Sequence, residues 1–341
     1  MTSEYDGNAD SPANKPKTGS FKATSRRLRQ GRKNHLGHRA SLDWRLDKER
    51  VCVPAGEKPA YVDLDDLKEV ILKSRTGTAL LSGEGAANLR ICYDSQSAVS
   101  QFYPRGEECI ITLNPHRPRG DLLNMLAREL RRAWQHHQGA LVNPMGFEPD
   151  QAVLINRAQQ ADVLMVSIKV AWELKLLGEN EAWEFMNGSP MAGVTRVFET
   201  SAQKDFRTLN NGEAARAAYD KFFDGSSTKM HDKRIIHQML LDDQGYMKAS
   251  FKRQKAGIEL FKKMGEMPHG RNYLSIQGKR LPTDLCYSTI EDRSNANFLW
   301  FIKFERSFQE KEMQMVQESV KTSAEIVDFA KWSAVPRGPN R

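Results

Sequence analysis

The composition describes a globular protein with a strongly charged N-terminal part. The chain has 341 residues, of which 39% are hydrophobic, enough to bury a core in one large or two smaller domains. Its four cysteines lie far apart without a C-x-x-C pair, which excludes a disulfide framework and a cysteine zinc site. The most apolar run, at 163–177, is broken by Lys169, Glu173 and Lys175, and the N-terminus lacks the apolar stretch of a secretory signal. We therefore expect a cytoplasmic protein without a membrane span, and export by a specialised secretion system stays compatible with this sequence.

Most of the net charge of +8 comes from a predicted disordered basic tail at residues 1–50. Residues 15–50 carry twelve Lys and Arg against three acidic residues, whereas residues 1–14 carry three acidic residues and no basic one. The piece "SRRLRQGRKNHLGHR" could make weak contacts with nucleic acid or an acidic partner through counterion release. It has no interleaved aromatic residues to stack on bases, so a solubilising tail is the simpler interpretation.

The folded part is predicted to begin near residue 60 with a helix. In "VDLDDLKEVILKSR" the apolar residues Leu64, Leu67, Val70 and Ile71 repeat at helical spacing. Two strands, "NLRICYD" and "ECIITLN", are predicted next and could pair antiparallel. A helix over about 120–138 follows. Residues 150–178 predict a long buried helix, because they are apolar over most of the helix circumference.

The remaining chain is predicted to be mostly helical. Shorter helices are expected at 179–187, 190–200, 210–224 and 231–242, with glycine-containing breaks between them. The segments "LPTDLCYSTI" and "NFLWFIKF" are expected to be ordered, with the aromatic residues of the second forming core or helix-packing surface, and 309–332 to form a terminal helix. A small antiparallel sheet followed by a helical bundle gives an α+β class, with a domain at 60–245 and a C-terminal extension at 246–341.

The segment "MLARELRRAWQHHQ" places one glutamate in the frame of a zinc motif. In H-E-x-x-H the two histidines hold zinc one helical turn apart, and the glutamate acts on the bound water. Together with "IITLNP" and "INRAQQADVLMVSIKVAWELKLLG", the segment resembles the bacterial putative metallopeptidase domain family of unknown function over about residues 62–245. This resemblance implies a zincin-like fold whose first helix carries H-E-L-R-H-A-W-Q. Aligned on Trp134 and Gln135, Arg128 and Arg132 take the histidine positions and Glu129 that of the catalytic base.

The family's second helix carries R-x-x-E-A-D, whose glutamate would be the third zinc ligand. Aligned on Arg157 and Asp162, Gln160 stands at that glutamate position. A guanidinium has no free lone pair for zinc, and two cations one turn apart repel a divalent ion. The adjacent His136 and His137 point in different directions on a helix, and the other histidines are scattered. We therefore predict no zinc cofactor, although the family resemblance implies one.

Two roles are predicted for the substituting residues. Glu129 and Arg132 are at i, i+3 and can pair, while Arg128 or Arg132 could reach Asp162 or Glu173 on the long helix, so that an ion-pair network replaces the metal. Alternatively, Arg128, Arg132 and His136 follow one another at i, i+4 spacing and so lie on one stripe of the helix. A former active-site cleft lined by this stripe could hold an anion such as phosphate or a substrate carboxylate.

Three functions are compatible with these residues. The favoured one is a catalytically inactive relative of a zinc peptidase, with a vestigial Glu129, that acts as a binding or regulatory module for a peptide or protein ligand. The second is an active hydrolase with a displaced metal site or with no metal. The third is a binder of nucleic acid or acidic proteins that acts through its basic tail.

Overall fold

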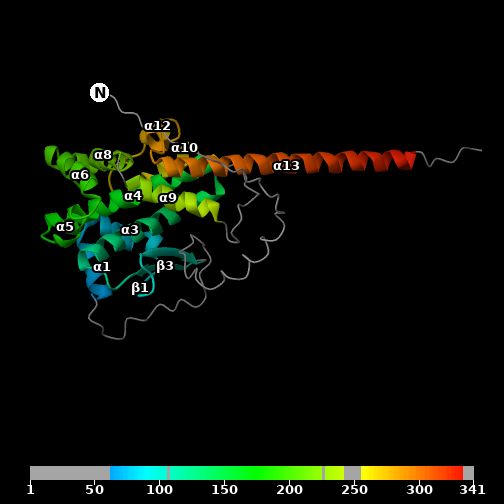
Figure 1. The fold of residues 1–341 in the computed structure, drawn as a ribbon. Helices are drawn as coiled ribbons and strands as arrows, with labels where there is room; N and C mark the ends of the chain where they lie inside the picture. The colour runs from blue at the N-terminus through cyan, green and yellow to red at the C-terminus, as the bar shows by residue number, and fades with distance from the viewer. Residues whose placement is uncertain (1–61, 106–107, 225–226, 242–254, 333–341) are drawn as a thin grey trace, which may run out of the picture. The chain divides into compact units, whose positions relative to one another are not determined.

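The computed structural model describes residues 62–105, 108–224, 227–241 and 255–332, all within one compact unit (Figure 1). The predicted basic tail lies outside the described residues. The α+β class is confirmed, with many helices and one small sheet. The first predicted helix is α1 (Leu64–Lys73), and its four apolar residues at helical spacing are all buried. Helix α2 (Arg75–Ser82) and the short η1 (Glu84–Ala86) connect α1 to the sheet.

The sheet contains β1 (Leu89–Tyr93), β2 (Gln101–Arg105) and β3 (Glu108–Leu113) in the order β1-β3-β2. Both predicted strands are present, but their predicted antiparallel pairing is wrong: β1 pairs with β3 in parallel, with Leu89 opposite Cys109. The strand β2, which the sequence analysis missed, reverses the chain between them and pairs antiparallel with β3. Pro104 hides this strand from a pattern search, and proline is tolerated there because β2 is an edge strand.

Two long helices form the centre of the structure, α3 (Arg119–His137) and α4 (Pro149–Leu176). The short η2 (Pro144–Gly146) precedes α4, which has proline in its first turn, where the missing N–H costs no hydrogen bond. The prediction of a long buried helix is confirmed, since almost all residues between Ala152 and Ala171 are buried. Figure 1 shows α4 in the middle, with α3 below it and α8 above it, and α4 contacts both.

The predicted shorter helices are present with shifted boundaries. They are α5 (Glu181–Asn187), α6 (Ala192–Lys204), α7 (Thr208–Asn211), α8 (Glu213–Phe223) and α9 (Ser227–Leu240). The single helix predicted at 210–224 begins only after Gly212, whose left-handed φ of 87° separates α7 from α8. Helix α9 packs against α4, the helix that carries Gln160, although the two helices are far apart along the chain.

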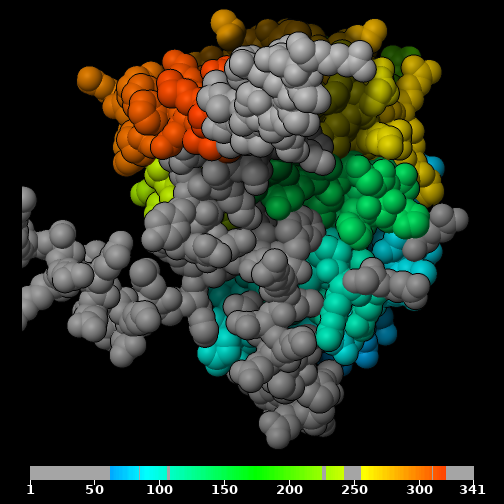
Figure 2. Space-filling view, turned by 90° about the vertical axis from the view of Figure 1, so that its right-hand side faces the viewer, coloured from blue at the N-terminus to red at the C-terminus, as the bar shows by residue number. Residues whose placement is uncertain are grey.

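Residues after 255 pack back onto the same core through α10 (Ile258–Met264), α11 (Gln277–Arg280) and α12 (Leu285–Ser288). Phe261, Met264 and Tyr273 are buried in one cluster with residues of α3 and α4. The predicted boundary between 245 and 246 falls in residues 242–254, outside the described residues. Figure 2 shows this order at the surface, with cyan residues of the sheet region below, green residues above them, and yellow and orange residues of the last segments at the top.

The last helix, α13 (Arg293–Trp332), joins two segments that the sequence analysis treated separately. Leu299 and Ile302 pack in a second core cluster with residues of α4 and α9. The prediction that this run forms core or helix-packing surface therefore holds only for Leu299 and Ile302. Its aromatic residues are exposed: Phe298, Trp300, Phe301 and Phe304. None of the helices in the described part of the chain is long and apolar enough to cross a bilayer.

Candidate functional site

The three positions predicted to correspond to zinc ligands lie on the facing helices α3 and α4. Arg128 and Arg132 are one turn apart on α3, and Gln160 is on α4. The Arg132 Nη2 donates to Gln160 Oε1 at 3.0 Å. The packing of α3 along α4 therefore brings Arg132 and Gln160 together, as the alignment of the two motifs predicts.

Glu129 is held by neighbours that occupy its carboxylate. Its side chain is 1% exposed. Arg132 Nη1 donates to both carboxylate oxygens, at 2.8 and 2.9 Å, which confirms the predicted i, i+3 pair. Ser100 Oγ, just before β2, donates to Oε1 at 2.8 Å. These donors engage the lone pairs of the carboxylate before any ligand arrives.

Arg128 differs from Arg132 because it has no hydrogen-bond partner among the described residues. In the part of the chain that the structure describes, none of its N–H groups makes a hydrogen bond or ion pair, and its Nε is fully buried. Burial lowers the pKa of Arg128, and the charges of Arg132 and Arg234 lower it further, while Glu129 and Asp121 act in the opposite direction. A partly buried guanidinium without an acceptor is costly, because desolvation is not offset by hydrogen bonds.

Helix α9 adds a histidine and a third arginine to this region. Burial lowers the pKa of His231 to about 4, and the nearby charges of Arg128, Arg234 and Arg132 contribute in that order. We call Arg128, Arg132, His231 and Arg234 the cationic cluster. The contribution of α9 was not predicted from the sequence, in which the one local signal is that His231 and Arg234 share a helix face at i, i+3 spacing.

The predicted extension of the α3 stripe to His136 is not part of this cluster. The His136 ring lies against Phe102 of β2, with ring centroids 5.7 Å apart. Burial and the neighbouring His137 lower the pKa of His136, and neither Arg128 nor Arg132 contributes. Among the residues described, no group of three His, Cys, Asp or Glu side chains could hold a metal ion.

The predicted contacts of Arg128 or Arg132 with the carboxylates of α4 are wrong. Asp162 instead accepts from Arg131, whose Nε and Nη2 donate at 2.8 and 3.0 Å, and both side chains are fully buried. Glu173 accepts from the backbone N–H and the hydroxyl of Thr76 and from the hydroxyl of Ser74, which caps the N-terminus of α2. Arg131 directly precedes Arg132 on α3, and successive residues are rotated by about 100°, so the two side chains leave the helix in different directions.

The Asp162 carboxylate is the centre of a buried polar network. Gln135 Nε2 and the Tyr273 hydroxyl also donate to it. Burial and then the charge of Asp162 raise the pKa of Tyr273 well above its ordinary value, so this hydroxyl remains a donor. Trp134 packs on Arg131, with the guanidinium carbon 4.2 Å from the ring centroid.

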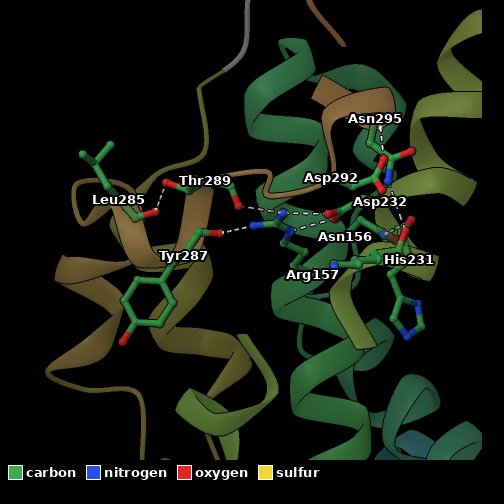
Figure 3. Close-up of polar contacts among 10 residues, drawn as sticks. Asn156, Arg157, His231, Asp232, Leu285, Tyr287, Thr289, Asp292 and Asn295 are labelled. Atoms are coloured by element: carbon green, nitrogen blue, oxygen red, sulfur yellow. Dashed lines mark hydrogen bonds and ion pairs between the residues drawn. The ribbon is translucent and has the colours of Figure 1, made fainter. Parts of the chain in front are cut away.

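Arg157 forms a second buried network that joins α4 to α9 and to the segment after α11 (Figure 3). Its Nε and Nη2 donate to Asp232 at 2.7 and 2.6 Å. It also donates to the backbone carbonyls of Tyr287 at 2.8 Å and Thr289 at 3.0 Å. Because Asp232 follows His231 directly, this pair fixes the start of α9 against α4, and His231 points away from the ion pair in Figure 3.

A family model decides the relationship. The model of the putative metallopeptidase family DUF6782 matches residues 45–275. The chain belongs to the putative metallopeptidase family. Searches of curated proteins and of solved structures found no match. The match continues past Tyr273, so the metallopeptidase-family region includes the residue that closes the Asp162 network from the C-terminal side.

Within this putative metallopeptidase family member, the motif residues other than the predicted ligands are structural. Gln135 and Trp134 contact Asp162 and Arg131, and Arg157 holds Asp232. These contacts hold α3 and α9 in their positions against α4. The remaining positions are those of the cationic cluster with Glu129 and Gln160.

Proposed function

We propose that this member of the family has lost the catalytic zinc site and acts as a binding or regulatory module. The observation that carries the proposal is the position of Arg132. Its guanidinium donates both to Glu129, at the predicted position of the base, and to Gln160, at the predicted position of the third ligand. A cation therefore occupies the hydrogen-bonding groups that a metal and its activated water would need.

The donor set does not fit zinc. Structural and catalytic zinc sites use thiolate, neutral imidazole or carboxylate, and guanidinium groups have no free lone pair. The positive charges of Arg128 and Arg132 also repel a dication. Two unit charges 4 Å apart repel each other by about 4 kcal/mol at an effective dielectric constant of 20. Glu129, without a metal to acidify water, is a poor activator of a water molecule for peptide hydrolysis.

Metal analysis of the purified full chain tests this proposal. We expect no stoichiometric zinc by elemental analysis and no saturable zinc binding in calorimetry. The triple variant Arg128→His, Arg132→His, Gln160→Glu should bind about one zinc ion, because it restores two imidazoles and a carboxylate on facing helices. The matched control Arg128→Gln, Arg132→Gln, Gln160→Glu removes the same positive charges but supplies no imidazole, and it should not bind zinc.

Tightly held zinc in the unmodified protein, together with hydrolysis of a peptide substrate that chelators abolish, would overturn the proposal. Zinc binding by the triple variant but not by its control would support the assignment of the three ligand positions. Equal behaviour of the triple variant and the control, with both correctly folded, would refute that assignment.

A further inference from the structure

The unpaired guanidinium of Arg128 indicates that this site is built for a ligand. Its Nε is fully buried, and none of its N–H groups has an acceptor within the described ranges. Its neighbours are better satisfied: Arg157 donates to Asp232 and to backbone carbonyls, and Arg132 donates to Glu129 and Gln160. Arg131 donates to Asp162 and to backbone carbonyls, although its buried Nη1 has no partner within the described ranges. Arg128 is partly buried, and a partly desolvated guanidinium without an acceptor gains from an added one.

The charge of the surroundings shows which acceptor fits. Arg128, Arg132 and Arg234 bring three positive charges, and Glu129 neutralises one of them. Asp121, the other carboxylate near Arg128, pairs with Arg117 at 3.3 Å, so this pair adds no net charge. The region is left with two uncompensated positive charges. A monocarboxylate would neutralise one of these charges, whereas a phosphomonoester carries about −1.5 to −2 at pH 7.

We propose that the cationic cluster binds a phosphate-type dianion, either inorganic phosphate or the phosphoryl group of a monoester. Arg128 supplies N–H groups without acceptors from α3, and the exposed Arg234 of α9 adds positive charge near Arg128 and His231. Guanidinium groups match the oxygen geometry of phosphate and can donate two parallel hydrogen bonds. The proposal rests on the proposed function, since a site that held zinc would present different side chains to the ligand.

His231 provides a reporter of this binding. Its imidazole is kept neutral by burial and by the three arginines around it. A bound dianion would offset their field, so its pKa should rise when phosphate is present. Asp232, next to it, is already paired with Arg157 and does not compete for the ligand.

The test is calorimetric titration of the full chain with inorganic phosphate, O-phosphoserine and acetate at constant ionic strength. We expect phosphate or phosphoserine to bind and acetate to bind at least about tenfold more weakly. Arg128→Gln and Arg234→Gln should each weaken phosphate binding by about tenfold or more, the effect of losing a charged hydrogen bond. Arg207→Gln is the matched control, because Arg207 is exposed and pairs only locally with Asp205. If Arg128→Gln does not fold, the exposed Arg234 still gives a variant that keeps the core intact.

Binding of both phosphate compounds, lost in the two cluster variants and kept in the control, supports the proposal. Stronger binding of phosphoserine identifies a monoester as the ligand, whereas stronger binding of phosphate identifies the free ion. Equal binding of acetate, or equal losses in Arg207→Gln, would overturn it. Absence of phosphate binding in a zinc-free protein would overturn this inference and leave the proposed function standing, whereas bound zinc would remove both.

Discussion

The buried pair of Arg131 and Asp162 gives the most direct test of how this fold is held together. We consider Asp162→Asn, which keeps the size and shape of the side chain but removes its charge. In the native protein the carboxylate accepts hydrogen bonds from Arg131, Gln135 and Tyr273, and both members of the ion pair are 0% exposed. The variant leaves the guanidinium of Arg131 in the core without a counter-charge.

The expected loss follows from this complete burial. Removing one partner of a buried ion pair costs about 3–5 kcal/mol, because the remaining charge is desolvated and uncompensated. Arg131 keeps its hydrogen bonds to the carbonyls of Met264 and Glu266 at 2.6 and 2.8 Å, which favours the lower end of that range. In a folded region of this size, about 3 kcal/mol corresponds to a fall in Tm of about 6–12 °C.

Thermal unfolding followed by circular dichroism and urea unfolding measure this loss. Arg207→Ala is the control, since its partner Asp205 is also at the surface, and we expect no change in Tm from it. A fall in Tm for Asp162→Asn no larger than that of Arg207→Ala would refute the reasoning. The double variant Arg131→Met, Asp162→Leu should recover part of the loss, because replacing both charges removes the uncompensated one.

Three further predictions follow from single contacts. Arg157→Lys should destabilise the protein by roughly 2–3 kcal/mol in urea unfolding, because an ammonium cannot replace the paired hydrogen bonds to Asp232 and those to two carbonyls; a loss below 0.5 kcal/mol would contradict this. Gly120→Ala should lower Tm and reduce the free energy of unfolding by about 1–3 kcal/mol, because the added Cβ would lie 2.4 Å from the Glu181 carbonyl oxygen on α5. An unchanged Tm would show that α3 and α5 can move apart without cost. His231→Asn should flatten the pH dependence of stability. The pKa of His231 is about 4 in the folded protein and 6.5 in the unfolded chain, so the unfolded chain binds more protons, and the stability of the native protein falls by up to about 3 kcal/mol as the pH drops from 6.5 to 4. Equal slopes of stability against pH in the variant and the native protein would count against this prediction.

The sequence predicted best those elements whose pattern is local. Helix α1 and the buried α4 have apolar spacings that leave no strong alternative, and both are present. The strand β2 could not be predicted in the same way, because Pro104 is acceptable only at a sheet edge, and edges are defined by tertiary structure. The parallel pairing of β1 and β3 depended on that missing strand. Local periodicity also failed to separate the packed face of α13 from its exposed aromatic face.

The candidate site shows the same division between local and long-range information. The motif frame placed Arg132 beside Glu129 and Gln160, and these contacts are present. The sequence could not show that His231 and Arg234 approach from α9, because about seventy to a hundred residues separate them from the motifs and no periodic signal connects the two. It also assigned Asp162 to the wrong arginine of α3.

The pairing of Asp162 with Arg131 shows how α3 and α4 can keep their packing when the residues at the motif's ligand positions differ. Helix α3 carries two neighbouring stripes of polar residues: Arg131 and Gln135 hold Asp162, whereas Arg128 and Arg132 stand at the motif's ligand positions. The first pair is buried, and it keeps α3 and α4 in place through hydrogen bonds that involve no ligand. Substitution of the second pair therefore leaves the main polar link between the helices intact. A frame with such internal links can keep its geometry whichever side chains stand at the positions of Arg128 and Arg132.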